Sequence, residues 1–189
     1  DMITQSRLRL DQEAIRGLYL ERGFPDVEVN VETEEEDGKN RVIFTIEEGY
    51  QTSIRDIDFS GNTFASESTL RGVLESKTQN IFNPGTFQEK NIEQDIENLE
   101  RYYREHGYVD AEVVDVQRKV ERDEEDKRSY MTLTYYIEEG EQYTYEGMSF
   151  EGNQIFTDEE LSKLVRQQPG DPVNMTKVEN DYRRIVERY

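Results

Sequence analysis

The chain has 189 residues, of which 33% are hydrophobic and 35% charged, with a formal net charge of −20 and no cysteine. Nucleic-acid binding draws its affinity from Lys and Arg, so this charge argues against a nucleic-acid partner and disfavours an anionic membrane surface. The lack of cysteine excludes a disulfide framework and a thiolate metal site. No apolar stretch approaches the roughly 18 residues of a membrane-spanning helix.

The sequence repeats itself after 91 residues. Glu47-Glu48-Gly49 returns as Glu138-Glu139-Gly140, and Phe59-Ser60-Gly61-Asn62 returns as Phe150-Glu151-Gly152-Asn153. Shared spacing of this kind predicts a tandem array, which usually presents surfaces rather than an active site. We expect three units cut from a larger protein: the C-terminal part of a first unit (1–50), a complete unit (51–141) and the N-terminal part of a third (142–189).

In the first unit a helix precedes two strands. Its inward face carries Leu8, Ile15 and Tyr19, with Asp11 as a mismatch. The strands alternate apolar and polar residues from Val27 and again from Val42, which is typical of a hairpin with one buried face. The helix ends at Gly23-Phe24, and a glycine followed by an aromatic residue predicts a Schellman cap in which Phe24 packs on Tyr19.

The middle unit contains the full set of elements. A strand over 54–59 leads to the turn Gly61-Asn62, whose residues tolerate positive φ, and Ser66 is an N-cap candidate for a short helix. A long helix over 88–105 ends at Gly107-Tyr108, which predicts a second cap, with Tyr108 packing on Tyr103. Two strands over 111–120 and 130–137 close the unit.

The third unit repeats the first half of this pattern. A strand is expected near Tyr145, followed by the turn Gly152-Asn153 and a short helix with a capping box formed by Thr157 and Glu160. A second helix carries Val178, Tyr182, Ile185 and Tyr189 on one face. The order β-α-α-β-β predicts an α+β fold in which two helices pack on one face of a three-stranded mixed sheet.

We predict no catalytic, cofactor-binding or metal-binding site. The hairpin tips 34–37 and 123–126 are acidic, but their spacing matches no calcium loop, and a solvated tip explains them better. His106 is the only histidine, lies at a helix end and has no evident nucleophile partner, so it is interpreted as a surface residue favoured by the helix dipole. Glycine-rich phosphate-binding patterns are absent.

This arrangement resembles the POTRA domain, and most closely the tandem POTRA domains of BamA-type outer-membrane protein assembly factors. The resemblance covers the whole chain and is carried by the turns, the long helices and their caps: Phe59, Gly61, Asn62, Tyr103, Gly107 and Tyr108, with Phe150, Gly152 and Asn153, and Tyr19, Gly23 and Phe24.

The resemblance implies a periplasmic arm that receives unfolded outer-membrane proteins, docks accessory assembly lipoproteins and contacts neighbouring POTRA units. It also implies that the membrane is reached only through a barrel absent from this chain. In that family the client adds to a sheet edge by β-augmentation. Here the edge strand is Ala111-Glu112-Val113-Val114-Asp115-Val116-Gln117.

Three alternatives stay open from the sequence. Charged residues on the same strand, Glu112, Asp115, Arg118 and Lys119, are equally consistent with an edge that is merely protected. The chain is also consistent with the POTRA arm of a related secretion or translocation protein. In a third hypothesis it is a purely structural scaffold without client binding, with contacts through tyrosines near the joints, such as Tyr50, Tyr143 and Tyr145.

Overall fold

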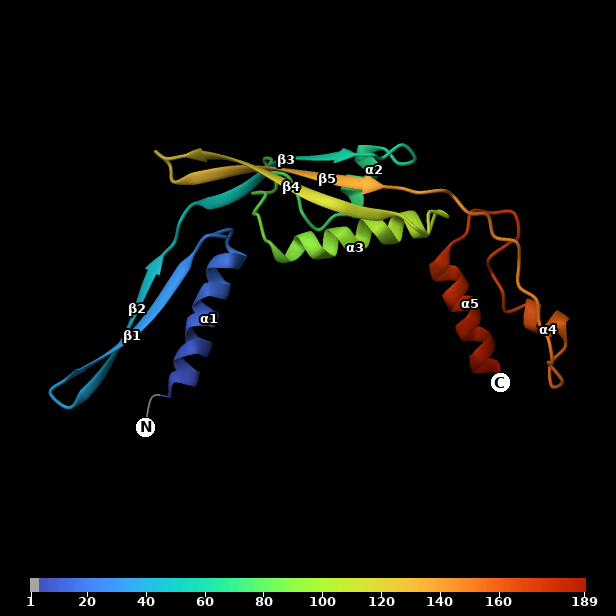
Figure 1. The fold of residues 1–189 in the computed structure, drawn as a ribbon, viewed down its shortest axis with the longest axis horizontal. Helices are drawn as coiled ribbons and strands as arrows, with labels where there is room; N and C mark the ends of the chain where they lie inside the picture. The colour runs from blue at the N-terminus through green and yellow to red at the C-terminus, as the bar shows by residue number, and fades with distance from the viewer. Residues whose placement is uncertain (1–3) are drawn as a thin grey trace. The chain divides into compact units, whose positions relative to one another are not determined.

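The computed structural model describes residues 4–189, shown in Figure 1. None of the helices in this range is both long and apolar enough to cross a membrane. The elements in chain order are α1 (Gln5–Glu21), β1 (Glu28–Glu36), β2 (Lys39–Glu47), β3 (Gln51–Ser60), α2 (Glu67–Val73), α3 (Lys90–Arg104), β4 (Glu112–Asp123), β5 (Arg128–Glu138), α4 (Asp158–Ser162) and α5 (Met175–Arg188).

Two sheets are present among these residues. β1 and β2 form an antiparallel hairpin in which Glu28 faces Glu47 and Glu36 faces Lys39. The second sheet has the order β3-β5-β4, so β5 is central and β4 lies at an edge. Its strands and the two helices α2 and α3 follow the predicted β-α-α-β-β order, which confirms the α+β fold.

The core of the middle repeat lies between the sheet and its helices. Alternate residues of β5, including Leu133 and Tyr135, are buried, as expected for a strand with one covered face. The helices contribute Leu70 of α2 and Leu99 and Tyr103 of α3, none more than 1% exposed. Aromatic and aliphatic side chains of this size provide most of the burial in a domain with so few apolar residues.

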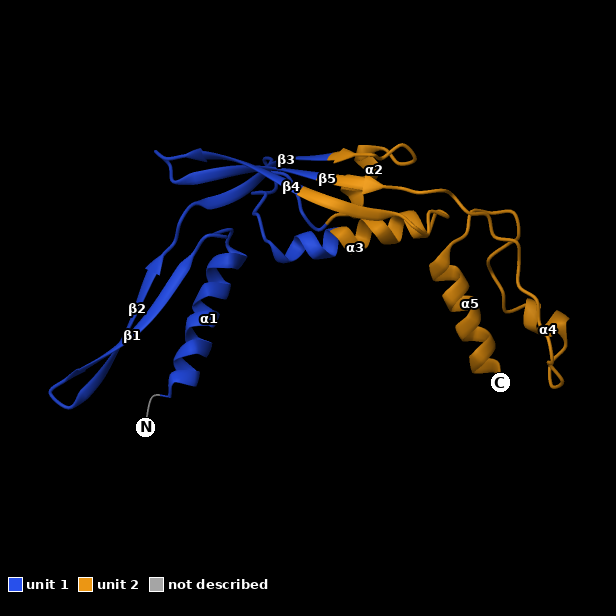
Figure 2. Ribbon diagram, viewed as in Figure 1, with its two compact units in different colours: residues 1–58, 75–95, 117–134 blue, residues 59–74, 96–116, 135–189 orange. Residues whose placement is uncertain are grey.

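Two compact units emerge from the distribution of contacts, shown in Figure 2. One comprises residues 1–58, 75–95 and 117–134, and the other residues 59–74, 96–116 and 135–189. The division crosses β3, α3, β4 and β5, so it falls inside the middle repeat. Each unit contains the place where one repeat joins the next, and the contacts at these joints are described below within one unit at a time.

The long helices α1 and α3 end in the same cap. Gly107 has a φ of 90°, the Tyr108 N–H donates to the Tyr103 carbonyl at 3.0 Å, and the Tyr108 and Tyr103 rings meet edge to face. In α1, Gly23 has a φ of 87° and Phe24 makes the corresponding bond and ring contact with Tyr19. These are the features of a Schellman cap, which turns the chain out of the helix in a defined direction.

The cap glycine of α1 also begins a joint to the next repeat. Its carbonyl oxygen accepts from the Thr52 N–H at 2.7 Å, and the Thr52 carbonyl accepts from the Phe87 N–H at 3.0 Å, just before α3. The Gln51 amide adds a bond to the Arg22 carbonyl at 3.0 Å. The end of one long helix is therefore tied to the start of the next through the first residues of β3.

The joint after α3 is built in the same way. The Gly107 carbonyl accepts from the Tyr143 N–H at 2.8 Å, and the Tyr143 carbonyl accepts from the Val173 N–H at 2.9 Å. Gln142 donates its amide to the His106 carbonyl at 2.9 Å, as Gln51 does to Arg22. Because most of these bonds join backbone groups, the joint tolerates the change from Thr52 to Tyr143.

The Gly61-Asn62 turn is tied to the end of β5. The Glu139 carboxylate accepts from the N–H groups of Thr63 and Phe64, each at 2.9 Å, and from the Thr63 hydroxyl. A Cβ on Gly61, whose φ is 87°, would overlap the Ile137 carbonyl oxygen, so the close approach requires glycine. The second glutamate of the repeated Glu-Glu-Gly motif thus satisfies backbone donors of the turn.

A related contact exists in the first repeat, where the Tyr19 hydroxyl donates to Glu48 at 2.9 Å. In the middle repeat Tyr103 lies beside Glu139. Burial is the main cause that raises the pKa of Tyr103 far above its ordinary value, and the Glu139 carboxylate raises it further. The repeated tyrosine and glutamate therefore meet in both repeats.

Each long helix of the middle and third repeats buries an aspartate. Asp95 is 0% exposed and accepts from the N–H groups of Glu75 and Ser76 at 2.6 and 3.2 Å. Asp181, also 0% exposed, accepts from those of Arg166 and Gln167, both at 3.0 Å. Burial opposes ionisation of Asp181, but these bonds and the ion pair with Arg184 outweigh it and lower its pKa.

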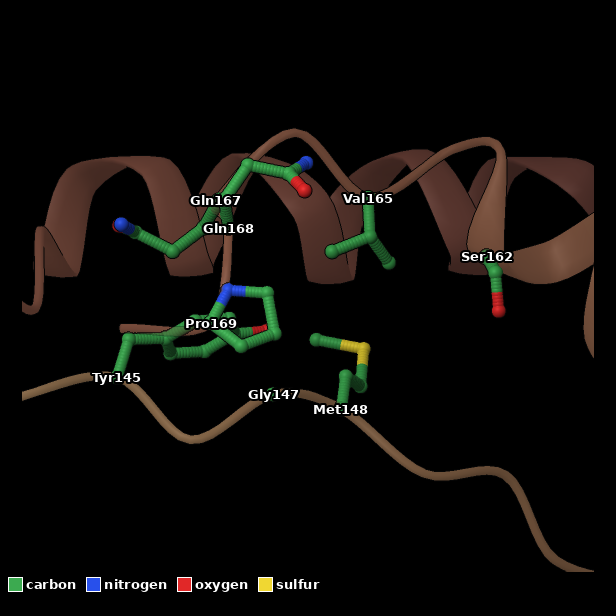
Figure 3. Close-up of a pocket in the computed structure, with 8 residues that line it drawn as sticks. All are labelled: Tyr145, Gly147, Met148, Ser162, Val165, Gln167, Gln168 and Pro169. Atoms are coloured by element: carbon green, nitrogen blue, oxygen red, sulfur yellow. The ribbon is translucent and has the colours of Figure 1, made fainter. Parts of the chain in front are cut away.

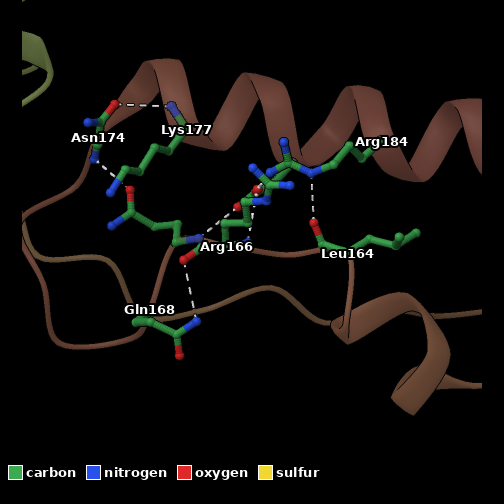
Figure 4. Close-up of polar contacts among 8 residues, drawn as sticks. Leu164, Arg166, Gln168, Asn174, Lys177 and Arg184 are labelled. Carbon is green, nitrogen blue, oxygen red and sulfur yellow. Dashed lines mark hydrogen bonds and ion pairs between the residues drawn. The ribbon is translucent and has the colours of Figure 1, made fainter.

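Figure 4 shows polar contacts between α5 and the loop before it in the third repeat. Arg184 donates to the Leu164 carbonyl at 2.9 Å, while the Asn174 side chain caps α5 by accepting from the Lys177 N–H at 3.0 Å. These polar groups tie the long helix to the loop before it.

The buried aspartates correct the expectation for Asp11. The spacing of 84 residues that matches Tyr103 to Tyr19 also matches Asp95 to Asp11, so Gln12, not Asp11, replaces the apolar Ile96. Asp11 therefore occupies the position of the buried Asp95 in the first repeat, although Asp11 itself is exposed. Gln12 turns its amide to the Val29 carbonyl of β1.

The strand expected near Tyr145 is wrong. Residues 145–150 form no strand, and the segment makes only an isolated bridge, from Thr144 to Pro172. Without a partner strand like β5, which flanks β3 in the middle repeat, this segment has no ladder to join. The apolar face of α5 is correspondingly open: Tyr182 and Tyr189 are 67% and 61% exposed.

Replacing Gly107 with Ala should weaken the second joint. A Cβ there would lie 2.7 Å from the Tyr143 carbonyl oxygen and 3.1 Å from the Pro172 Cβ, in addition to the strain at positive φ. We expect the free energy of unfolding to fall by more than the roughly 1 kcal/mol that positive φ alone costs. Gly152→Ala is the matched control, because its φ is 76° but its Cβ would meet nothing within 4 Å. If urea denaturation gave the same loss of unfolding free energy for both variants, the proposed contribution of Gly107 to the joint would be contradicted.

Glu139→Gln should destabilise the chain in a pH-dependent way. Burial opposes ionisation of Glu139, but hydrogen bonds from Thr63 and Phe64 outweigh it and lower its pKa below the ordinary 4.5. Its stabilisation is therefore complete above that ordinary value and is lost as the pH falls through the lowered one. We expect a loss of about 1–3 kcal/mol at pH 7 that shrinks in acid.

Urea denaturation at pH 7 and at pH 3 measures this effect. Glu138→Gln is the control, since the neighbouring Glu138 is exposed. A loss of the same size at both pH values would show that the carboxylate charge is unimportant.

Candidate functional site

The edge strand β4 is the candidate interaction surface. The predicted edge residues fall here: Ala111 is buried and directly precedes the strand, and Glu112 to Gln117 form its first half. Val113 and Val116 are partly exposed, while the polar residues of this half are exposed. Because β5 pairs with β4 on one side only, the other side of β4 offers backbone groups outside the sheet.

Apolar side chains extend along β4 in a single row. Val114 and Val120 are 48% and 45% exposed, and Val116 lies between them at the same parity, so all three project from one face of the strand. Arg118 shares this row and pairs with Glu89. Val120 lies beyond the predicted edge 111–117, although the alternation of valines in the sequence continues to it.

Part of the edge is already occupied by a side chain. The Val113 N–H donates to the Glu100 carboxylate of α3 at 3.2 Å, and Glu100 also lies 3.7 Å from Arg104. The ion pair of Arg118 with Glu89 adds a second contact between β4 and the start of α3. Glu100 could not be predicted for this site, because its spacing from Val113 in the sequence follows no local pattern. The edge is thus neither fully open nor fully covered.

His106 lies in an aromatic cluster rather than alone at the surface. Its ring centroid is 4.4 Å from that of Tyr102 and 5.6 Å from that of Phe64, and its Nδ1 is 2.6 Å from the Tyr102 carbonyl oxygen. The ring is partly buried. The histidine therefore lies at the helix end, as predicted, and its ring also packs in the aromatic cluster around Phe64.

The other predicted interaction residues and acidic tips differ in what they offer. Tyr143 is 46% exposed and its hydroxyl donates to Asp110 at 3.1 Å, whereas Tyr145 is buried. The acidic tip 34–37 is exposed. Throughout residues 4–189, no group of three or more His, Cys, Asp or Glu side chains is placed to hold a metal ion.

The lining of a pocket in the third repeat, shown in Figure 3, includes the polar residues Ser162, Gln167 and Gln168 besides apolar side chains. Met148, Val165 and Pro169 border it, together with Tyr145. Its wall is the same segment that lacks a strand partner. None of the residues that line this pocket is charged.

Comparison with known proteins identifies the repeats. The family model described as "POTRA: Surface antigen variable number repeat" matches residues 1–49, 52–140 and 143–189. The chain is 37% identical, over all 189 residues, to a putative outer membrane protein assembly factor of Treponema pallidum (strain Nichols), of which it covers 23%. It is 28% identical over 171 residues to outer membrane protein assembly factor BamA of Neisseria meningitidis serogroup B, covering 20% of it.

A solved structure has the same fold. The crystal structure of Haemophilus influenzae BamA POTRA3-5 matches with a TM-score of 0.52 and 24% identity, over 100% of this chain and 72% of that one. The chain spans between a fifth and a quarter of the length of the two curated relatives described above. Since the matched segments together cover nearly all of its residues, the chain belongs to the POTRA family, whose repeats form the periplasmic part of outer-membrane proteins.

Proposed function

We propose that this chain is part of the periplasmic arm of an outer-membrane protein assembly factor, and that β4 binds segments of unfolded outer-membrane proteins by β-augmentation. The observation that carries the proposal is the position of β4 at the sheet edge with an exposed valine row. The relatives' names, which describe outer membrane protein assembly factors, support the cellular role.

Backbone pairing explains how one strand serves many clients. An extended segment that pairs with β4 satisfies N–H and C=O groups of its own, whatever its side chains. Outer-membrane strands alternate apolar and polar residues, so a client strand offers one apolar row. The row of Val114, Val116 and Val120 provides an apolar surface of matching period.

The Glu100 contact makes client binding a competition. Its carboxylate occupies the Val113 N–H and must leave before a client carbonyl takes that donor. Because the exchange replaces one hydrogen bond by another, its net cost is modest and binding is weak and reversible. Weak binding suits an arm that passes its clients on.

The scaffold hypothesis has its own support. Glu100 and the Arg118–Glu89 pair both cover parts of β4, and charged side chains are a common protection of sheet edges. In that case the arm acts through neighbouring POTRA repeats and docked accessory assembly lipoproteins only. Both functions are non-enzymatic, and the experiments below separate them.

Photo-crosslinking should distinguish the edge from the rest of the surface. Crosslinkers placed singly along 111–117 and along the acidic tip 123–126 are irradiated with an unfolded outer-membrane protein. We expect adducts on β4, strongest at the exposed Val114, because the client lies alongside the strand. Equal labelling of strand and tip would sink the proposal in favour of the scaffold.

Glu100→Ala should increase client binding at the edge. The substitution frees the Val113 N–H without altering β4 itself. An extended client can then accept a hydrogen bond from this group without displacing Glu100, which should strengthen its binding by about 0.5–1.5 kcal/mol. The measurement is the yield of client adduct at Val114 relative to the unmodified chain. Glu97→Ala, one helical turn earlier on α3, is the control. A yield unchanged or reduced by Glu100→Ala would indicate that β4 is not the receptor.

A further inference from the structure

Two large apolar residues are almost completely exposed in the loop between α2 and α3. Ile81 and Phe82, here called the apolar tip, are 90% and 91% exposed, more than any other large hydrophobic residue among those the structure describes. Single exposed apolar residues are common on protein surfaces, but an adjacent pair at this exposure calls for an explanation.

The apolar tip lies in an insertion whose limits are set by hydrogen bonds. In the third repeat, Tyr145 bonds to two adjacent residues: its carbonyl accepts from Gly170 N–H at 2.8 Å and its N–H donates to Asp171 at 2.9 Å. In the middle repeat Ile54 makes the same two bonds, with Gln79 at 2.7 Å and Gly85 at 2.6 Å. Residues 80–84 are thus added between two framework positions and are not needed by the framework.

The insertion holds the apolar tip in one conformation. The backbones of Asn80 and Asn83 bond to each other at 2.8 and 3.3 Å, which closes the loop at its base. The Asn80 side chain accepts from the N–H groups of Phe82 and Asn83 at 2.8 and 3.0 Å, and the Asn83 side chain accepts from Gly85 N–H at 2.8 Å. A pre-formed loop loses little conformational entropy when it binds.

The charge around the apolar tip differs from that of the rest of the chain. No Asp or Glu occurs between Glu75 and Glu89, the longest such interval in a sequence with 43 acidic residues. Lys77 is the only charged residue in the interval. The centre of a protein interface is usually depleted of charge, because buried carboxylates without partners are costly.

We propose that the apolar tip inserts into an apolar pocket of a folded partner protein whose surrounding surface is basic. The acid-free interval allows the tip to be buried without desolvating carboxylates, while the acidic remainder of the chain attracts a basic surface. The net charge of −20 opposes a second copy of this chain and an anionic bilayer. A two-residue apolar anchor is of the size that dominates protein interfaces.

The test uses the full-length protein in its own cells, with a photo-crosslinking p-benzoylphenylalanine in place of Phe82. The control is the same crosslinker in place of Ile155, another apolar residue that is 75% exposed. We expect an adduct to one protein at position 82 and not at 155, with a yield that falls about tenfold or more when Ile81→Ser is added.

The protein identified in that adduct is then purified and its affinity for the full-length protein is measured. We expect Phe82→Ser to raise the Kd by about tenfold or more. Added salt should raise the Kd further, because it screens the attraction between the acidic chain and the basic partner. An adduct to lipid, no adduct above the control, the same adduct at both positions, or a Kd that neither Phe82→Ser nor salt changes would each overturn the proposal.

A deletion variant separates docking from folding. Removing residues 80–84 together with Gln79→Gly and Gly85→Asp reproduces the Gly170-Asp171 connection of the third repeat. We expect this variant to denature at the urea concentration of the unmodified protein and to lose the partner. Unfolding of the variant would show that the insertion belongs to the framework and would overturn the proposal. The edge strand β4 is unchanged in all these variants, so client binding is tested separately.

Discussion

The carbonyl oxygen of the glycine that ends α1 and of the one that ends α3 is the group on which the arrangement of consecutive repeats depends. At Gly23 and at Gly107 it accepts an N–H from the first residues of the next repeat, whose carbonyl in turn accepts from the residue just before the next long helix. Both glycines adopt the αL conformation that turns the chain at the end of a helix, and glycine does so without strain. Each of the two compact units contains one of these joints.

A framework made of backbone bonds leaves side chains and loops free to vary. Thr52 and Tyr143 occupy the same joint position, and Phe87 and Val173 the same helix entrance, because only their N–H and C=O groups are used. The same freedom permits five residues to be inserted between Gln79 and Gly85 without disturbing either bond to Ile54. Differences between repeats therefore lie in surface side chains and loops, which partners can contact. The backbone hydrogen bonds of the framework place no limit on the residue types in those loops.

Local patterns in the sequence predict what local physics decides. The caps at Gly23 and Gly107, the box of Thr157 and Glu160 and the alternation in β5 each depend on a few neighbouring residues. Features that depend on residues far apart in the sequence could not be predicted in this way. Periodicity treats a polar residue on an apolar face as a break, yet Asp95 and Asp181 are buried there because loop N–H groups satisfy them. Residues 145–150 have strand-like composition, but a strand exists only when another strand pairs with it, and the Glu100 contact to β4 follows from the fold alone.

Strong negative charge and an incompletely covered edge are physically connected. A sheet edge that accepts any extended chain also accepts the edge of another copy, and backbone pairing provides no discrimination between the two. Charge provides this discrimination. Two copies of the chain, each with a net charge of −20, repel each other over a distance of about 8–10 Å in physiological salt. A client without that charge is not repelled. In the proposed function of β4, acidic residues on the surface oppose self-association at this edge without closing it to clients. The acid-free interval around Ile81 and Phe82 lacks this protection, but the protruding pair, which we propose to enter a pocket, cannot pair with a strand.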